Sequence, residues 1–259
     1  MIKYFALIVF GFTFFACNGN EPIPSINQLS TPTKKVTRYY NFVKDIPLPE
    51  GYTLQNMASN SFAAWLANIP LKKDNTVYLF NGNVKQNQEA QFAVLNISVS
   101  NKNLQQCADA VMRMRAEYLF AQNKMDEIQF IDNERSQYKF KEPFTRAHFV
   151  QYLDKVFGMC GSASLAKQLQ QKSKFENIAA GDVIIRGGFP GHAVMVMALA
   201  ENTEGKKIYL LAQSYMPAQD IHVLQNPMNK NLSPWYEVND EDIIQTPEYI
   251  FKKSELMQW

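Results

Sequence analysis

Apolar positions recur at helical spacing through the middle of the chain. Over residues 103–122 an apolar side chain falls every three or four residues, which is typical of an amphipathic helix. Asn103 and Gln106 form a pair typical of a helix start. Shorter patterns predict further helices at 60–67, 145–157 and 162–171.

β-branched and aromatic runs predict the strands. Residues 76–80 and 92–99 are expected to pair as a hairpin with a long loop, and 128–131 forms another strand. A second group, 182–186, 192–199, 207–215 and 220–225, suggests an antiparallel meander. The proline-containing remainder is expected to be loop-rich. Because helices and strands occupy separate stretches, we predict a single α+β domain over residues 36–259, not a doubly wound sheet.

The first residues are typical of a targeting segment. Residues 1–16 hold Lys3, an apolar stretch too short to span a bilayer, and a small residue before Cys17. This junction resembles a bacterial lipobox, so Cys17 is the expected lipidation site, carrying acyl chains such as palmitate. Residues 18–35 have the composition of a flexible tether. We therefore expect a membrane-anchored lipoprotein of the cell envelope, facing the periplasm or the cell surface. An ordinary signal peptide with a chance cysteine is the alternative.

Composition narrows the chemistry. The 26 basic and 24 acidic side chains give a net charge of +2, which offers no electrostatic case for nucleic acid and leaves membrane attachment to the lipid. No two cysteines stand in a C-x-x-C spacing, so we expect no metal, and the glycine run at 187–191 lacks a phosphate-loop Lys-Ser/Thr, so we expect no cofactor. With three cysteines and three histidines, a nucleophilic site has few candidates.

His192 is the strongest candidate for a catalytic base. It follows a glycine-rich loop and opens an apolar strand, where an imidazole can face a cleft. The alternative is a hydrogen-bonded histidine at a sheet edge. His148 lies within a predicted helix and is interpreted as structural. His222 alternates with Ile221 and Val223 and is expected on the polar surface.

Cys107 is the preferred nucleophile. At a helix start, the helix dipole is expected to lower its pKa. Papain-like enzymes combine such a cysteine with a histidine that opens a later strand and a polar side chain that orients the imidazole. Here Gln213 follows at the end of the next strand, and Gln106 or Gln105 is placed to supply an oxyanion donor.

Three alternatives to a Cys107 nucleophile stay open. Cys107 shares an apolar stripe with Val111 and Met114, and a free cysteine is often buried. Cys160 also precedes a predicted helix and is a rival nucleophile. A Cys107–Cys160 disulfide would leave no nucleophile at all.

Three sequence blocks carry a resemblance to known proteins. Residues 104–113, 181–194 and 211–219 resemble a family of bacterial envelope lipoproteins known as domain of unknown function 4846. Cys107 falls inside one of these blocks, and Cys160 does not. The family implies no activity.

The Gly181-Asp182-Val183 to His192 segment also resembles, more loosely, a strand pair of NlpC-type murein peptidases and amidases. That resemblance implies a papain-like fold and hydrolysis of cell-wall peptides, with the helices at 145–172 as an insertion.

Three hypotheses follow. In the first, Cys107, His192, Gln213 and Gln106 form the site of a cysteine peptidase or amidase that acts on a peptide, a peptidoglycan-like substrate or another amide. In the second, the same fold binds a peptide or glycan without chemistry. In the third, the protein is structural and its two cysteines are bonded. The first requires the Cys107 thiol and the His192 ring to share an open cleft.

Overall fold

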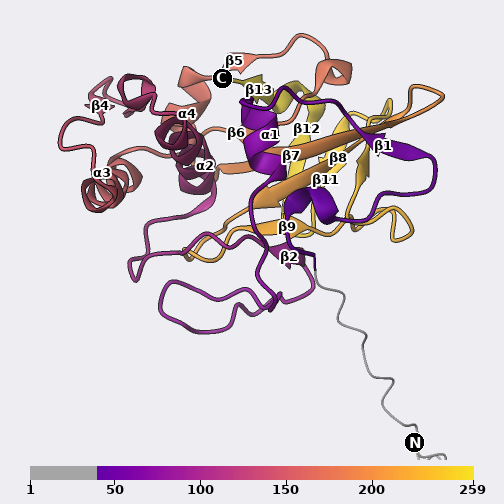
Figure 1. Cartoon of the computed structure of the whole chain (residues 1–259), viewed down its shortest axis with the longest axis horizontal. Coiled ribbons are helices and arrows are strands. Elements are labelled where there is room, and N and C mark those ends of the chain that lie inside the picture. The colour runs from indigo at the N-terminus through magenta and orange to yellow at the C-terminus, as the bar shows by residue number, and fades with distance from the viewer. Residues whose placement is uncertain (1–39) are drawn as a thin grey trace, which may run out of the picture. The chain divides into compact units, whose positions relative to one another are not determined.

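The structure is a computed structural model, and it describes residues 40–259. An antiparallel sheet forms the centre of this part of the chain (Figure 1). Its strand order is β2-β9-β8-β7-β6-β13-β5. The predicted meander is confirmed, and its members are β6 (Val183–Arg186), β7 (His192–Asn202), β8 (Lys207–Gln213) and β9 (His222–Leu224). The described residues, 40–259, belong to one compact unit. The predicted signal peptide, Cys17 and the tether lie outside the described residues.

Short strands extend this sheet and form two small ones. The extending strands are β1 (Tyr52–Leu54), β2 (Gln91–Val94), β5 (Gln170–Gln171), β10 (Tyr236–Glu237) and β13 (Leu256–Gln258). The two small sheets pair β3 (Gln129–Ile131) with β4 (Gln137–Lys139), and β11 (Ile243–Gln245) with β12 (Ile250–Lys252). Residues 226–259, expected to be mostly loop, therefore contribute four strands.

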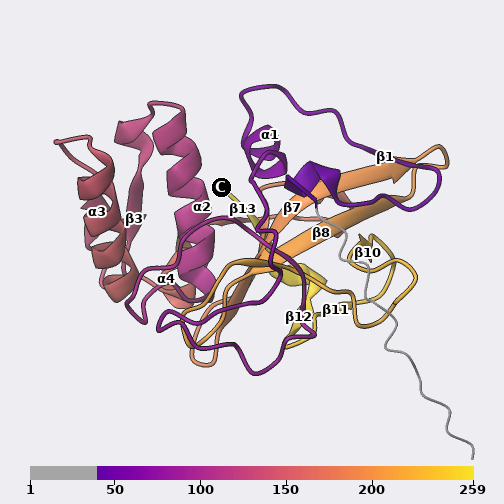
Figure 2. The same ribbon diagram turned by 60° about the horizontal axis from the view of Figure 1, so that its bottom comes forward.

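The four α-helices within residues 40–259 lie close to their predicted positions. They are α1 (Phe62–Ala67), α2 (Cys107–Ala121), α3 (Arg146–Met159) and α4 (Ser162–Gln168), and short 3₁₀ turns occupy Val43–Asp45, Met125–Glu127, Phe175–Asn177 and Lys253–Glu255. Figure 2 shows α2, α3 and α4 gathered at one side of the sheet. The architecture is therefore α+β.

Helix α2 begins four residues later than the apolar spacing predicts. Gln106 has extended backbone geometry, and its N–H donates to the Asp109 carboxylate at 3.0 Å. This bond within the first turn sets the start of the helix. Cys107 consequently occupies the first helical position.

Both faces of the meander are covered. Along β7, Ala193 and Met195 belong to the core shared with α2, whereas Val194 and Val196 pack with C-terminal side chains such as Phe251. Strands buried on both faces read as continuous apolar runs. A polar side chain in these strands therefore faces protein on either side.

The predicted hairpin of 76–80 with 92–99 is wrong. Residues 76–80 make only isolated bridges, such as Leu79 with Gln219, and β2 pairs with β9. The partner of β2 is β9, the edge strand of the meander, which lies too far along the chain for local spacing to reveal it.

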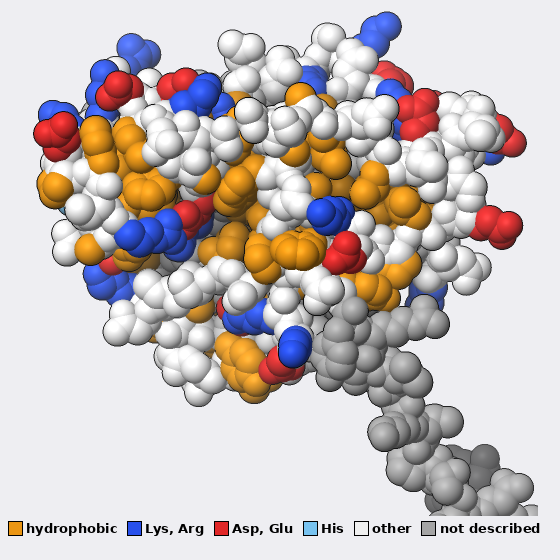
Figure 3. Space-filling model, viewed as in Figure 1, with side chains coloured by type: hydrophobic (Ala, Val, Ile, Leu, Met, Phe, Trp, Pro, Cys, Tyr) orange, Lys and Arg blue, Asp and Glu red, His pale blue; other side chains and the backbone are white. Residues whose placement is uncertain are grey.

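The surface mixes charges of both signs with apolar side chains on the face drawn in Figure 3. Within the described residues, no helix has the length and apolar character needed to cross a membrane.

Candidate active site

A cavity of about 470 Å³ lies beside the first turns of α2 and α4, the loop before β7 and the segment after β8. It is lined from α2 by Cys107, from β7 by His192, and from the segments after β8 and β11 by Tyr215 and Tyr249. The loop before β7 (residues 187–191) contributes part of its wall. The structure thus brings the predicted cysteine and histidine to one cavity.

His192 is held firmly at the start of β7. It pairs with Arg186 of β6, and its side chain is only 2% exposed. The ring packs against Tyr215 and Tyr249, with centroid distances of 4.7 and 4.8 Å, and stacks on Phe251 at 5.7 Å with an interplanar angle of 22°. This aromatic surround fixes the plane of the imidazole.

The loop before His192 depends on glycine. Gly188 has φ +127°, a conformation that side-chain-bearing residues rarely adopt. A Cβ on Gly191 would lie 2.3 Å from Ser162 Oγ and 2.5 Å from the Gly188 carbonyl oxygen. The glycines thus let the loop fold tightly against the start of α4.

A chain of side-chain hydrogen bonds orients the imidazole. Gln213 Oε1 lies 2.7 Å from His192 Nε2, and Gln213 Nε2 donates to Glu248 Oε2 at 2.8 Å. Because Glu248 accepts from the amide nitrogen, the amide oxygen must face His192, and Nε2 therefore carries the proton. The lone pair lies on Nδ1, which makes no hydrogen bond within residues 40–259.

Glu248 is itself held by two side chains. Lys85 Nζ lies 2.7 Å from its Oε2, and Asn87 Nδ2 donates to its Oε1 at 3.2 Å. Lys85 is buried, which lowers its pKa, although the Glu248 charge opposes this shift. Sequence reasoning missed Glu248 and Lys85, because neither residue lies in a motif or near the other site residues in the chain.

The Cys107 thiol is half-buried at the start of α2. Burial raises its pKa, and the backbone N–H groups of Ala108 and Ala193 counteract this only in part. The expectation that the helix dipole would lower this pKa is therefore wrong, because desolvation of the thiolate outweighs it. Ala193 directly follows His192 in β7, so the hydrogen bond from its backbone N–H places the Cys107 thiol beside the first residues of this strand.

At rest, the thiol and imidazole form a neutral pair. Burial lowers the pKa of His192 to about 4, while that of Cys107 is raised. No hydrogen bond joins the two side chains in this structure. Catalytic hydrogen bonds are often long in a free enzyme and tighten when substrate binds.

The two candidate oxyanion glutamines lie in different surroundings. Gln106 lines the cavity, and its Nε2 lies 3.4 Å from Asn103 Oδ1. Gln105 is buried, and its Oε1 accepts from Arg113 at 3.0 Å. Only Gln106 is open to a ligand in the cavity.

Cys160 also lines the cavity and is not bonded to Cys107. Both cysteines are free, so the structure does not contain the proposed disulfide. Burial raises the pKa of Cys160 to about 12, so this thiol is the weaker nucleophile.

Comparison with protein-family models identifies the family of the chain. Residues 43–145 and 132–258 match domain of unknown function 4846. The chain belongs to this family. No curated protein and no solved structure matches it.

The other two histidines of this DUF4846 protein lie elsewhere. The ring of His148, near the start of α3, contacts the Pro143 carbonyl oxygen through Nδ1 at 2.9 Å. The prediction of a surface His222 is wrong, because the covered sheet buries it completely. Its Nδ1 donates to the Asp220 carbonyl at 2.9 Å, and its Nε2 has no partner among the described residues.

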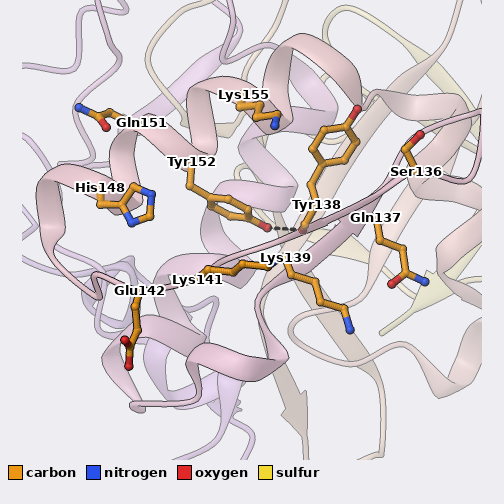
Figure 4. Close-up of a pocket in the computed structure, with 10 residues that line it drawn as sticks. All are labelled: Ser136, Gln137, Tyr138, Lys139, Lys141, Glu142, His148, Gln151, Tyr152 and Lys155. Carbon is orange, nitrogen blue, oxygen red and sulfur yellow. Dashed lines mark hydrogen bonds between the residues drawn. The ribbon is translucent and has the colours of Figure 1, made fainter.

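A second hollow of about 690 Å³ lies between β4 and α3 (Figure 4). Its lysines 139, 141 and 155 are exposed, and the Tyr152 hydroxyl donates to the Tyr138 carbonyl at 2.8 Å. The second hollow holds His148 but no cysteine among the described residues, so the 470 Å³ cavity remains the candidate active site of this DUF4846 protein.

Proposed function

We propose that this protein is a papain-like cysteine hydrolase that cleaves a peptide or another amide at the cell envelope. The observation that carries the proposal is the chain from His192 through Gln213 to Glu248, beside a cavity that also holds Cys107. A histidine held in one tautomer next to a thiol is the arrangement that nucleophilic cysteine catalysis needs.

The order of the elements supports a papain-like fold. Cys107 begins a helix that packs on an antiparallel sheet, His192 opens β7, and Gln213 ends the neighbouring β8. This sequence of roles agrees with the resemblance to NlpC-type peptidases and amidases. In this scheme α3 and α4 are an insertion between the cysteine and the histidine.

The proposed reaction proceeds in two steps. Cys107 Sγ attacks the carbonyl carbon of the amide while His192 Nδ1 takes the thiol proton. His192 then gives this proton to the leaving amine, the C–N bond breaks, and a thioester remains on Cys107. Water next attacks the thioester with His192 as base, which releases the acid and restores the thiol.

The oxyanion formed in each step needs donors. The Cys107 N–H lies in the first turn of α2, where backbone N–H groups have no partner within the helix. The Gln106 side chain reaches the same cavity. We propose that these two groups stabilise the oxyanion.

The neutral thiol–imidazole pair favours a second candidate function. A thiol with a raised pKa is a poorer nucleophile than a thiolate, so the cavity could bind a peptide or a glycan without chemistry. The two functions differ in whether a covalent intermediate forms.

Trapping the thioester tests the proposal. The purified protein is mixed with an activated acyl ester, quenched with acid and examined by peptide mass spectrometry. We expect the acyl group on Cys107, unchanged in Cys160→Ala and reduced at least tenfold in His192→Ala. An acyl group on Cys160, or none on Cys107 in protein of native circular dichroism, would support the binding function.

Attachment to the membrane is part of the same proposal. The lipobox-like junction at Cys17 supports a lipid anchor that places the domain at a membrane surface. Incorporation of labelled palmitate in cells should occur in the full chain and be lost in Cys17→Ser.

A further inference from the structure

Among the described residues, no side chain that lines the cavity of Cys107 and His192 carries a positive charge at neutral pH. No Lys or Arg lines it in the part of the chain that the structure describes, and Asp109 is its only acidic residue. A carboxylate moved from water into such a cavity loses its hydration and finds no cation to replace it. An acidic ligand is therefore disfavoured there.

Asp109 adds little negative charge to this surface. It is 5% exposed, one carboxylate oxygen accepts the Gln106 N–H, and the other has no partner among the described residues. Burial raises its pKa well above the usual range, which favours the neutral acid. The carboxyl therefore offers a cationic ligand little attraction.

The rim of the cavity is apolar and exposed. Phe189 is 96% exposed, and Met216 and Met159 are 66% and 53% exposed. These side chains come from three separate segments, namely the loop before β7, the segment after β8 and the end of α3, and all three line this cavity. Exposed apolar side chains that converge on a concave site mark a surface for an apolar ligand.

We propose that the site accepts a neutral amide flanked by apolar groups, and that it discriminates against acidic substrates such as carboxylate-bearing cell-wall stem peptides. The inference rests on the proposed function, because it takes Cys107 and His192 as the point where the scissile amide lies. The apolar rim contacts the flanking groups. The amide itself binds at the floor of the cavity, which is formed by Cys107, Asp109 and His192.

Binding to an inactive variant tests the inference without requiring turnover. Calorimetry on Cys107→Ala compares acetyl-Ala-Phe methylamide with acetyl-Ala-Glu methylamide. We expect the neutral peptide to bind at least tenfold more tightly. Equal binding, tighter binding of the acidic peptide, or no binding of the neutral peptide at millimolar concentration would overturn the inference.

Charge variants in the Cys107→Ala background sharpen the test. Met216→Lys places a cation on the rim, while Met228→Lys places one on another loop at an equally exposed methionine, 66% in both cases. Met216→Lys should narrow the preference for the neutral peptide at least threefold, and Met228→Lys should leave it unchanged. Asp109→Asn should also leave this preference unchanged, because burial disfavours the charged form of Asp109. If Asp109→Asn improves binding of the acidic peptide severalfold, the floor is charged and the inference fails.

The two proposals can fail separately. A neutral preference in Cys107→Ala, together with no thioester in the wild type, would retain the specificity and reject the hydrolase. A thioester on Cys107 with an acidic preference would retain the hydrolase and reject the specificity.

Discussion

At the scale of single residues, the proposed chemistry depends on which way one amide group points. Gln213 presents its oxygen to His192 because Glu248 holds its nitrogen. If the amide were reversed, its nitrogen would donate to Nε2, and the imidazole proton would move to Nδ1. The nitrogen proposed as the base would then have no lone pair.

Replacing Glu248 should therefore impair catalysis without touching the cavity wall. In Glu248→Leu, no acceptor fixes the amide, and we expect kcat/KM to fall by roughly 100-fold, because a wrong imidazole tautomer is costly in hydrolases of this kind. In Glu248→Gln, the new amide oxygen can still accept from Gln213 and Lys85, so the loss should be about tenfold or less. Steady-state kinetics on an amide substrate measures both.

A matched control separates this effect from a general loss of folding. Glu134→Leu removes an exposed carboxylate that lies outside the site. It should leave kcat/KM unchanged. If Glu248→Leu retained full activity with a native circular dichroism spectrum, Glu248 would have no part in orienting His192.

Sequence reasoning could place some of these residues but not all. His192 and Gln213 stand at the ends of neighbouring apolar strands, so strand spacing alone brings them close. Glu248 contacts Gln213 across 35 residues of chain, and Lys85 contacts Glu248 across 163 residues. No local pattern encodes either contact. The raised pKa of Cys107 was also hidden, because it depends on burial by the whole fold.

At the scale of elements, the loop before β7 determines where His192 begins its strand. Gly191 lies so close to Ser162 and to backbone oxygens that a side chain has no room. We expect Gly191→Ala to destabilise the fold by about 1–3 kcal/mol, as overpacking usually does, and to reduce activity at least tenfold by displacing the loop. Urea unfolding and kinetics measure the two effects.

Gly158 provides the comparison for this substitution. It lies in α3 beside the same cavity, and a Cβ there would meet no atom within 4 Å. Gly158→Ala should raise the free energy of unfolding by up to about 1 kcal/mol, because alanine is the better helix former. Equal stability of the two variants would contradict the close approach inferred at Gly191.

The elements that sequence patterns predicted best are those with a long local signal. The four helices and the meander were correct because their apolar periodicity spans many residues. The start of α2 was misplaced because Leu104 continues the apolar stripe, while the Asp109–Gln106 bond that begins the helix is a polar detail. The strand at 91–94 was assigned the wrong partner because β9 lies far away in the chain.

At the scale of the whole molecule, layers on both faces of the sheet bury two histidines. Burial lowers the pKa of His192 to about 4 and that of His222 to about 3. An unfolded histidine has a pKa near 6.5, so the unfolded chain binds more protons in the pH window between these values. The neutral histidines therefore favour the fold above pH 6.5, and this contribution is lost as the pH falls towards 4.

We expect each histidine to reduce the free energy of unfolding by about 2–3 kcal/mol between pH 7 and pH 4.5. Asp109 acts in the opposite sense, because its raised pKa lets the folded state bind a proton more readily. Comparison of variants therefore isolates the histidine effect. His222→Asn keeps a donor for the Asp220 carbonyl and should lose less stability on acidification than the wild type. Urea unfolding at both pH values measures this, and an unchanged pH dependence would contradict the burial argument.

Residues 243–259, which are synthesised after the proposed catalytic side chains, supply the group that completes the site. A chain that extends only through β9 already contains Cys107, His192 and Gln213, but it lacks Glu248 and also β13, which pairs with β6 next to the loop of His192. The nascent protein would thus carry a cysteine and a histidine without an ordered partnership until residues 243–259 have been added. Under the proposed function, the enzyme would gain activity only once residues 243–259 have folded onto the sheet, and cleavage of this segment would inactivate a mature molecule while leaving every catalytic side chain in place.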